Sequence, residues 1–284
     1  MAFPLVLKTL SALSLPGLYR IANVCSLLVR LIPNRTSKLI RQNIQLCFAE
    51  QDKKQLRRST IKHSCYSVLE LAAVWCWPAE KILARITSED ICDSFPQSKK
   101  GRIVIAPHLG SWELLNLWLA GQGDLISLYK PQPNAGVDQF VLNARSRNGA
   151  HLIPIDTSGL RQLSRGLKQG KTAMILPDQR PKKGKARVMA NFFGQEAPTT
   201  PMIHNLCKRI DCDIFLASIF RNRSNASFEL TLLELDRDKI AADQQSGLDY
   251  LNGEIEALIR RAPEQYQWGY SRFKPSTYRA MGQE

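Results

Sequence analysis

Residues 102–119, RIVIAPHLGSWELLNLWL, join an apolar run to an apolar helix across a short turn. The run at residues 102–107 is β-branched and unbroken, which is typical of a strand buried on both faces. The residues after it lack the alternation of a strand and predict a well-buried helix, with Ser111 as its N-cap. A buried strand that leads directly into a helix indicates an α/β fold.

The remainder of the chain continues this alternation. Apolar runs and amphipathic segments predict strands at residues 125–130, 151–155, 172–177, 213–221 and 227–235, and helices at residues 137–147, 159–168, 202–210 and 247–261. Residues 36–77 read as helical up to Pro78, and the polar residues 87–100 predict a connector. We expect a mostly parallel central sheet flanked by helices, with sites at the carboxyl ends of its strands.

An apolar segment at residues 5–33 precedes this fold, and three basic residues and a Pro-Gly pair interrupt it. Its longest uncharged stretch, residues 9–19, has 11 residues, about half of the roughly 20 that a spanning helix needs. We expect a helical segment that lies in the membrane interface, and two ordinary amphipathic core helices are the alternative. The expected organisation is a membrane-associating segment at 1–35 and a single α/β domain at 36–284.

Charge and cysteine content narrow the class of protein. Lys and Arg number 39 against 25 Asp and Glu, a net charge of +14 that favours anionic partners such as phospholipid surfaces, phosphorylated ligands, acidic proteins or nucleic acid. A hydrophobic content of 44% excludes a disordered tail. The seven cysteines form no C-x-x-C pair, so neither a disulfide framework nor a zinc site is expected.

His108 and Glu113 are candidate catalytic residues at the strand–helix junction. Five residues apart on one helix, they would point about 140° away from each other, so they cannot share a helix face. If His108 instead ends the strand and Glu113 occupies the first helical turn, Gly110 lets the chain fold the ring towards the carboxylate. The pair would then be a general base and its orienting group. An isolated H-x4-E also fits two structural roles, a strand end and a favourable first-turn residue.

Asp178 and Gln179 follow the strand predicted at residues 172–177, so they belong to the same edge of the sheet as His108. The basic loop RPKKGKARV comes next, beginning at Arg180. It is either a solvated surface loop or a site that grips a phosphate, a carboxylate or an acidic carrier. Ser111 lies near His108, but its expected capping role and the absence of a G-x-S-x-G motif make a covalent acyl-enzyme the weaker mechanism.

These motifs, in their order and spacing, resemble the late acyltransferases of bacterial lipid A biosynthesis, within the H-x4-[DE] superfamily that includes glycerolipid acyltransferases. His108 and Glu113 match that pair, and Asp178 with Gln179 matches the family's second site block. The resemblance covers most of the chain through RQNIQLCFAE (41–50), APHLGSWELLN (106–116), YKPQPN (129–134), ARSRNG (144–149), LPDQRPKKG (176–184), NFFGQEAPTT (191–200) and WGYSRFKP (268–275).

The resemblance implies a glycerolipid-acyltransferase-like fold and a specific reaction. A lauroyl or myristoyl chain would pass from acyl carrier protein, as co-substrate, to a hydroxyl of a 3-hydroxyacyl chain on a lipid A precursor, with no cofactor or metal. His108 would act as general base, with Glu113 orienting the ring. We expect Arg145, or alternatively Arg147, to be the cation near the oxyanion. The expected substrate-binding residues are Lys130, Arg145, Arg147, Asp178, Gln179 and Arg180.

The resemblance also implies partners and a location. Acyl carrier protein is acidic and the lipid A precursor bears phosphates, so both suit a charge of +14, and the enzyme would lie at the cytoplasmic face of the bacterial inner membrane. Lys8 and Pro16 interrupt the apolar segment, which departs from the family's usual anchor. Other acceptors within the superfamily are another glycolipid, an ornithine-type lipid or a lysophospholipid.

Two alternatives without enzyme activity are disfavoured by the sequence. A basic nucleic-acid-binding protein is disfavoured because the basic residues are scattered, no recognised binding motif occurs and aromatic residues do not alternate with the basic loop, so no nucleic acid partner is expected. A non-catalytic membrane adaptor with the same fold is disfavoured by the intact pair of His108 and Glu113.

Overall fold

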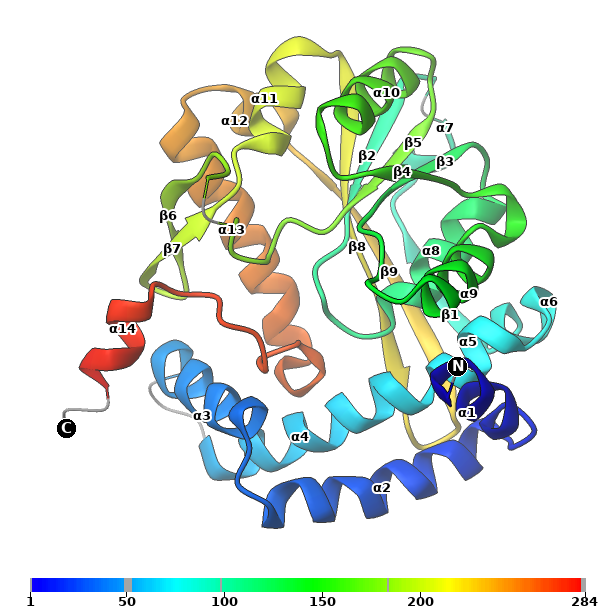
Figure 1. Cartoon of the computed structure of the whole chain (residues 1–284). Coiled ribbons are helices and arrows are strands. Elements are labelled where there is room, and N and C mark those ends of the chain that lie inside the picture. Colours follow the sequence, from blue (N-terminus) through cyan, green and yellow to red (C-terminus); the bar gives the residue numbers. More distant parts are fainter. Residues whose placement is uncertain (1, 49–52, 98, 183, 282–284) are drawn as a thin grey trace.

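The computed structural model describes residues 2–48, 53–97, 99–182 and 184–281, so residues 49–50 and 183 of two motifs lie outside it. Its centre is a seven-stranded sheet in the order β1-β9-β8-β2-β5-β3-β4 (Figure 1). Every pair is parallel except β8 with β9. The predicted α/β fold with a mostly parallel sheet is therefore confirmed. The strands are β1 (Ile86–Ile91), β2 (Gly101–Ile105), β3 (Leu125–Tyr129), β4 (His151–Pro154), β5 (Thr172–Ile175), β8 (Cys212–Asn222) and β9 (Ser227–Leu235).

Helices cover both faces of this sheet (Figure 1). The central strand β2 demonstrates why, because Ile103 and Ile105 join one apolar core while Val104, between them, joins the other. The helices are α1 (Ala2–Leu10), α2 (Leu15–Leu31), α3 (Arg35–Cys47), α4 (Lys53–Leu69), α5 (Leu71–Cys76), α6 (Ala79–Leu83), α7 (Ser94–Gln97), α8 (Trp112–Gly121), α9 (Ala135–Arg145), α10 (Thr157–Lys168), α11 (Met202–Arg209), α12 (Arg237–Ala241), α13 (Gln244–Arg261) and α14 (Pro275–Ala280).

Two segments differ from the sequence-based expectation. The polar stretch predicted as a connector contains β1, which pairs in parallel with β9 as an edge strand and is held by backbone bonds rather than by apolar side chains. A hairpin of β6 (Val188–Phe192) and β7 (Gln195–Thr199) was not predicted. Its turn has positive φ at Phe193 (53°) and Gly194 (72°), and a phenylalanine in that position is not the usual hairpin signal.

The N-terminal segment at residues 5–33 forms the helices α1 and α2, which are separated just before Pro16. Helix α2 packs on α4 along the outside of the molecule (Figure 1). Within the described residues, no single helix is both long and apolar enough to cross a membrane, and α2 with α3 meets that criterion only as a pair bent by 85°. The buried residues of α2 are Leu15, Leu18, Tyr19, Ala22 and Ser26. The exposed apolar residues of its outer stripe are Val24, Leu27, Leu28 and Leu31.

A buried ion pair attaches the N-terminal helices to the sheet. Arg221 of β8 is fully buried, and its Nε lies 2.5 Å and its Nη2 2.7 Å from the two carboxylate oxygens of Glu70, at the α4–α5 junction. Burial opposes the guanidinium charge, but the carboxylate more than offsets this and raises the pKa of Arg221. Nη2 also donates to Ser67 Oγ at 2.8 Å and to the carbonyl of Gly110 at 2.6 Å. The junction therefore joins α4, β8 and the turn after His108.

Replacing Glu70 with glutamine should lower the free energy of unfolding by about 3–5 kcal/mol, because the change leaves a buried guanidinium without its counterion. Urea titration monitored by circular dichroism measures this. Glu80→Gln, on the surface of α6, is the control for loss of a carboxylate. Equal stabilities of the two variants would show that the buried pair does not hold the fold.

Candidate active site

The sheet register places two candidate residues side by side. Strands β2 and β5 are parallel neighbours, with Ile105 paired to Ile175. His108 lies three residues beyond the first of these and Asp178 three residues beyond the second, so the equal offset carries both to the same point on the carboxyl edge. The predicted location of His108 and Asp178 is thus confirmed.

Asp178 holds the imidazole of His108 in one orientation. Its Oδ1 lies 2.8 Å from Nδ1 of the ring, and its Oδ2 accepts the backbone N–H of His108 at 2.9 Å. Burial alone would raise the pKa of Asp178, but the interaction with His108 and the hydrogen bonds from its ring, its N–H and the Tyr266 hydroxyl hold that pKa below the ordinary value. The group is therefore a carboxylate at neutral pH.

The ionised carboxylate determines which ring nitrogen carries the hydrogen. A carboxylate only accepts, so Nδ1 of His108 is the donor and Nε2 keeps its lone pair. The amide nitrogen of Gln179 lies 3.1 Å from Nε2 and donates to it. An imidazole that is held at Nδ1 and accepts at Nε2 has the geometry of a general base.

The orienting role predicted for Glu113 is filled by Asp178 instead. Glu113 does occupy the first turn of α8, but its carboxylate accepts from Trp75 Nε1 at 3.1 Å and from Arg145 Nε at 3.0 Å, with a second bond from Arg145 Nη2. Both ring nitrogens of His108 have other partners. The helix begins at Trp112, and from there the Glu113 side chain reaches α5 and α9 rather than the end of β2.

The two arginines proposed as site cations bind different partners. Arg145, at the end of α9, is paired with Glu113, and although burial opposes its charge, the carboxylate raises its pKa. Arg147 donates to the carbonyls of Trp77 (2.6 Å) and Val74 at the end of α5. The structure brings Arg145 to Glu113, whereas the guanidinium of Arg147 binds helix carbonyls.

Two further basic candidates follow strands β3 and β5 at the carboxyl edge of the sheet. Lys130 is exposed directly after β3, and its ammonium group lies close enough to that of Lys182 to lower the pKa of Lys182. Arg180 donates to the carbonyl of Phe273 at 3.2 Å. The start of the basic loop therefore lies beside Lys130, at the end of β3.

The C-terminal segment at residues 265–270 contributes to the site, although no residue in it was predicted as a site residue. The N–H of Gln267 donates to the carbonyl of His108 at 2.9 Å, and Tyr266 reaches Asp178. Asn43 of α3 holds the segment through the carbonyls of Trp268 (2.7 Å) and Tyr270 (2.8 Å). The motifs at 41–50 and 268–275 are thus in contact, but their spacing of more than two hundred residues concealed this.

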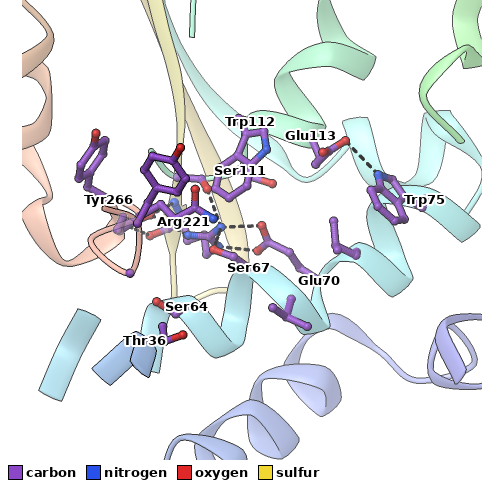
Figure 2. A pocket seen from close by; sticks show the side chains of 17 residues that line it. Thr36, Ser64, Ser67, Glu70, Trp75, Ser111, Trp112, Glu113, Arg221 and Tyr266 are labelled. Carbon is purple, nitrogen blue, oxygen red and sulfur yellow. Dashed lines mark hydrogen bonds and ion pairs between the residues drawn. The ribbon is translucent and has the colours of Figure 1, made fainter. Parts of the chain in front are cut away.

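A cavity of about 410 Å³ opens beside this group (Figure 2). Its lining combines apolar side chains, Val68, Leu71, Trp75 and Trp112, with polar ones, Ser64, Ser67, Glu70, Glu113 and Arg221. A small second cavity contains His108, Asp178 and Gln179, and the two adjoin because Tyr266, Gln267 and Tyr270 line both. The larger volume is in the usual range for small-molecule sites.

The fold and the site together define an α/β protein with a histidine base beside a partly apolar cavity. The family model described as "Bacterial lipid A biosynthesis acyltransferase" matches residues 2–275, so the chain belongs to the lipid A biosynthesis acyltransferases. It is an O-acyltransferase by this membership, and the resemblance noted in the sequence is confirmed.

Three relatives from Escherichia coli K12 show the range of acyl groups within the family. The chain is 25% identical to a lipid A biosynthesis lauroyltransferase over 95% of its length and 89% of the relative. It is 24% identical to a palmitoleoyltransferase over 84% and 79%, and 24% identical to a myristoyltransferase over 80% and 71%. The acyl group in each name belongs to that relative.

Asp178→Asn should make the free energy of unfolding less dependent on pH in the acidic range. A carboxyl whose folded-state pKa is depressed contributes stability above its unfolded value near 3.9, and this contribution is lost as pH falls through the folded-state pKa. The unfolding free energy of the wild type relative to the variant should therefore fall between about pH 5 and pH 3. Urea titrations at several pH values measure the difference, and the surface change Asp93→Asn controls for net charge. A difference that stays constant with pH would contradict an ionised, depressed Asp178.

Proposed function

We propose that this protein transfers a fatty acyl chain, of the lauroyl or myristoyl class, from acyl carrier protein to a hydroxyl of a 3-hydroxyacyl chain on a lipid A precursor. The observation that carries the proposal is the orientation of the His108 ring, whose Nδ1 is held by the buried carboxylate of Asp178 so that Nε2 is the acceptor, beside the 410 Å³ cavity. The names of the relatives, which include lauroyl and myristoyl transferases, support the acyl class.

The reaction follows from the positions of the ring nitrogens. His108 Nε2 takes the proton of the acceptor hydroxyl while the hydroxyl oxygen attacks the thioester carbonyl carbon. A C–O bond forms and the carbonyl electron pair moves to oxygen, giving a tetrahedral oxyanion. When the oxyanion collapses, the C–S bond breaks and the imidazolium returns its proton to the leaving thiolate. Asp178 stabilises the imidazolium between these steps, and such base catalysis is worth roughly 10²–10⁴-fold.

Gln179 occupies the direction from which the acceptor must approach. Its amide donates to His108 Nε2 in the free protein, so the incoming hydroxyl replaces this bond with its own. The exchange conserves the number of hydrogen bonds to the ring, so it has a small net cost. Gln179 therefore keeps the base oriented and excludes water until the lipid arrives.

The proposed partners match the charge of the site. Lys130 and Lys182 follow strands β3 and β5 at the carboxyl edge of the sheet and lie close together, which suits an acidic carrier protein or a phosphorylated sugar. Acyl carrier protein is the co-substrate, and the proposed chemistry requires no cofactor or metal because His108 moves the proton and the thioester is already activated.

His108→Ala should reduce acyl transfer by at least about 10²-fold, because the hydroxyl then loses its base. The assay follows labelled lauroyl and myristoyl groups from acyl carrier protein to a Kdo-bearing lipid A precursor in detergent. His151→Ala, at an exposed position on β4, is the matched control and should keep the wild-type rate. Equal rates for His108→Ala and wild type would remove His108 from the chemistry, and transfer only to lysophospholipid, ornithine-type lipid or another glycolipid would replace the proposed acceptor.

The same proposal places the enzyme at the cytoplasmic face of the inner membrane. Helix α2 turns one apolar stripe to α4 and a second one, containing Leu27 and Leu28, outwards. Arg20 and Arg30 lie on this helix and can reach lipid phosphates. An in-plane helix of this kind needs no spanning segment.

The double change Leu27→Asp/Leu28→Asp should lower binding to vesicles that contain phosphatidylglycerol by at least about tenfold, since burying each leucine is worth roughly 1.5–3 kcal/mol. Sedimentation with the vesicles measures the bound fraction. Leu160→Asp on α10, which is also exposed, is the control and should bind as the wild type does. Unchanged binding of the double variant would contradict attachment through α2.

A further inference from the structure

Ser111 has a hydroxyl group that the fold does not use. The residue stands at the N-cap of α8, but its side chain makes no capping hydrogen bond, so the predicted capping role is not found. It is 2% exposed, and its Oγ has no hydrogen-bond partner among the described residues. A buried hydroxyl without a partner costs free energy, and side chains retained at such a cost are often functional.

The backbone around Ser111 leaves two more donors unused. The N–H of Gly110 donates to Gln265 and that of Ser111 to Ile219, at 3.2 and 2.7 Å, which fixes the turn. In the part of the chain that the structure describes, the next two N–H groups, those of Trp112 and Glu113, have no hydrogen-bond acceptor. They lie in the first turn of a helix of 10 residues, where the helix dipole is positive. Three donors therefore gather at one point.

This point faces the cavity next to the proposed base. Figure 2 shows Ser111 between Trp112 and Arg221 among the residues that line the cavity. The ring of Trp112 is 5.2 Å from that of His108, so the start of α8 and the base are close. A nucleophilic serine would contact the base directly, whereas Nε2 of His108 contacts Gln179 instead.

We propose that the Ser111 hydroxyl, together with the N–H groups of Trp112 and Glu113, donates hydrogen bonds to the thioester carbonyl oxygen and to the oxyanion formed from it. This assignment rests on the proposed acyl transfer. The oxyanion receives the carbonyl electron pair when the C–O bond forms, and it returns that pair as the C–S bond breaks. Ser111 itself stays unmodified throughout and stabilises the oxygen only through its donated hydrogen bond.

Ser111→Ala tests this role through two measurements. The kcat for acyl transfer should fall by about 10²-fold, with little change in the KM of the acyl donor, because the lost bond strengthens in the transition state. The thermal unfolding midpoint of the free protein should stay the same or rise, because the hydroxyl has no partner there. Ser111→Thr, which keeps a hydroxyl, should recover part of the rate, and Ser164→Ala on α10 is the control for a serine away from the site.

Each other result overturns the assignment in a recognisable way. A wild-type rate in Ser111→Ala removes Ser111 but leaves the acyltransferase function intact. A lower rate that accompanies a lower unfolding midpoint makes Ser111 a structural cap, since loss of a cap destabilises the helix. An acyl group found on Ser111 by mass spectrometry makes it a nucleophile. A wild type that transfers acyl groups to no lipid acceptor overturns the proposed function together with this role.

Discussion

The fully buried guanidinium of Arg221 is the constraint on which the arrangement of the site depends. A charge at this depth requires a counterion and hydrogen-bond acceptors, and those of the guanidinium come from Glu70, Ser67, Gly110 and Gln265. These residues belong to the N-terminal helices, the turn after His108 and the C-terminal segment. The turn requires glycine at position 110, because its φ is 62° and a Cβ there would lie 2.1 Å from the carbonyl oxygen of Ile219. One ion pair thus unites three segments that are distant in sequence.

The fixed turn separates two carboxylates into two roles. Asp178 is buried, binds the ring and the backbone of His108, and holds the base. Glu113 lies only five residues from His108 and lines the larger cavity, but its carboxylate is bonded to Arg145 and Trp75. Each carboxylate has one cationic or potentially cationic partner, so neither buried charge is left uncompensated. The carboxylate of Glu113 is bonded to Trp75 and Arg145, and among the described residues the Ser111 hydroxyl has no hydrogen-bond partner, so that hydroxyl remains available as a donor.

The sequence predicted local features well and failed where the answer depends on which elements are neighbours. The apolar run of β2, the helix that contains Glu113 and the position of Asp178 at a strand end follow from periodicity alone. The choice of Asp178 over Glu113 as the partner of His108 depends on β5 lying beside β2 in register, which no local pattern reveals. Tyr266 was missed for the same reason. Strand β1 was missed because its polar residues carry no burial signal, and its backbone bonds to β9 hold it in place.

Helix α4 links the apolar surface to the chemistry. One side of it packs on α2, whose outer stripe is exposed, and another side lines the cavity through Ser64, Ser67 and Val68. Val68 is itself 54% exposed, so the apolar part of the cavity lining reaches the molecular surface. If α2 lies in the membrane interface as proposed, Val68 lies on the helix that packs directly on α2. An acyl chain that enters along α4 would then keep most of its apolar surface out of water. Each Å² of apolar surface kept covered in this way stabilises the bound chain by roughly 25 cal/mol.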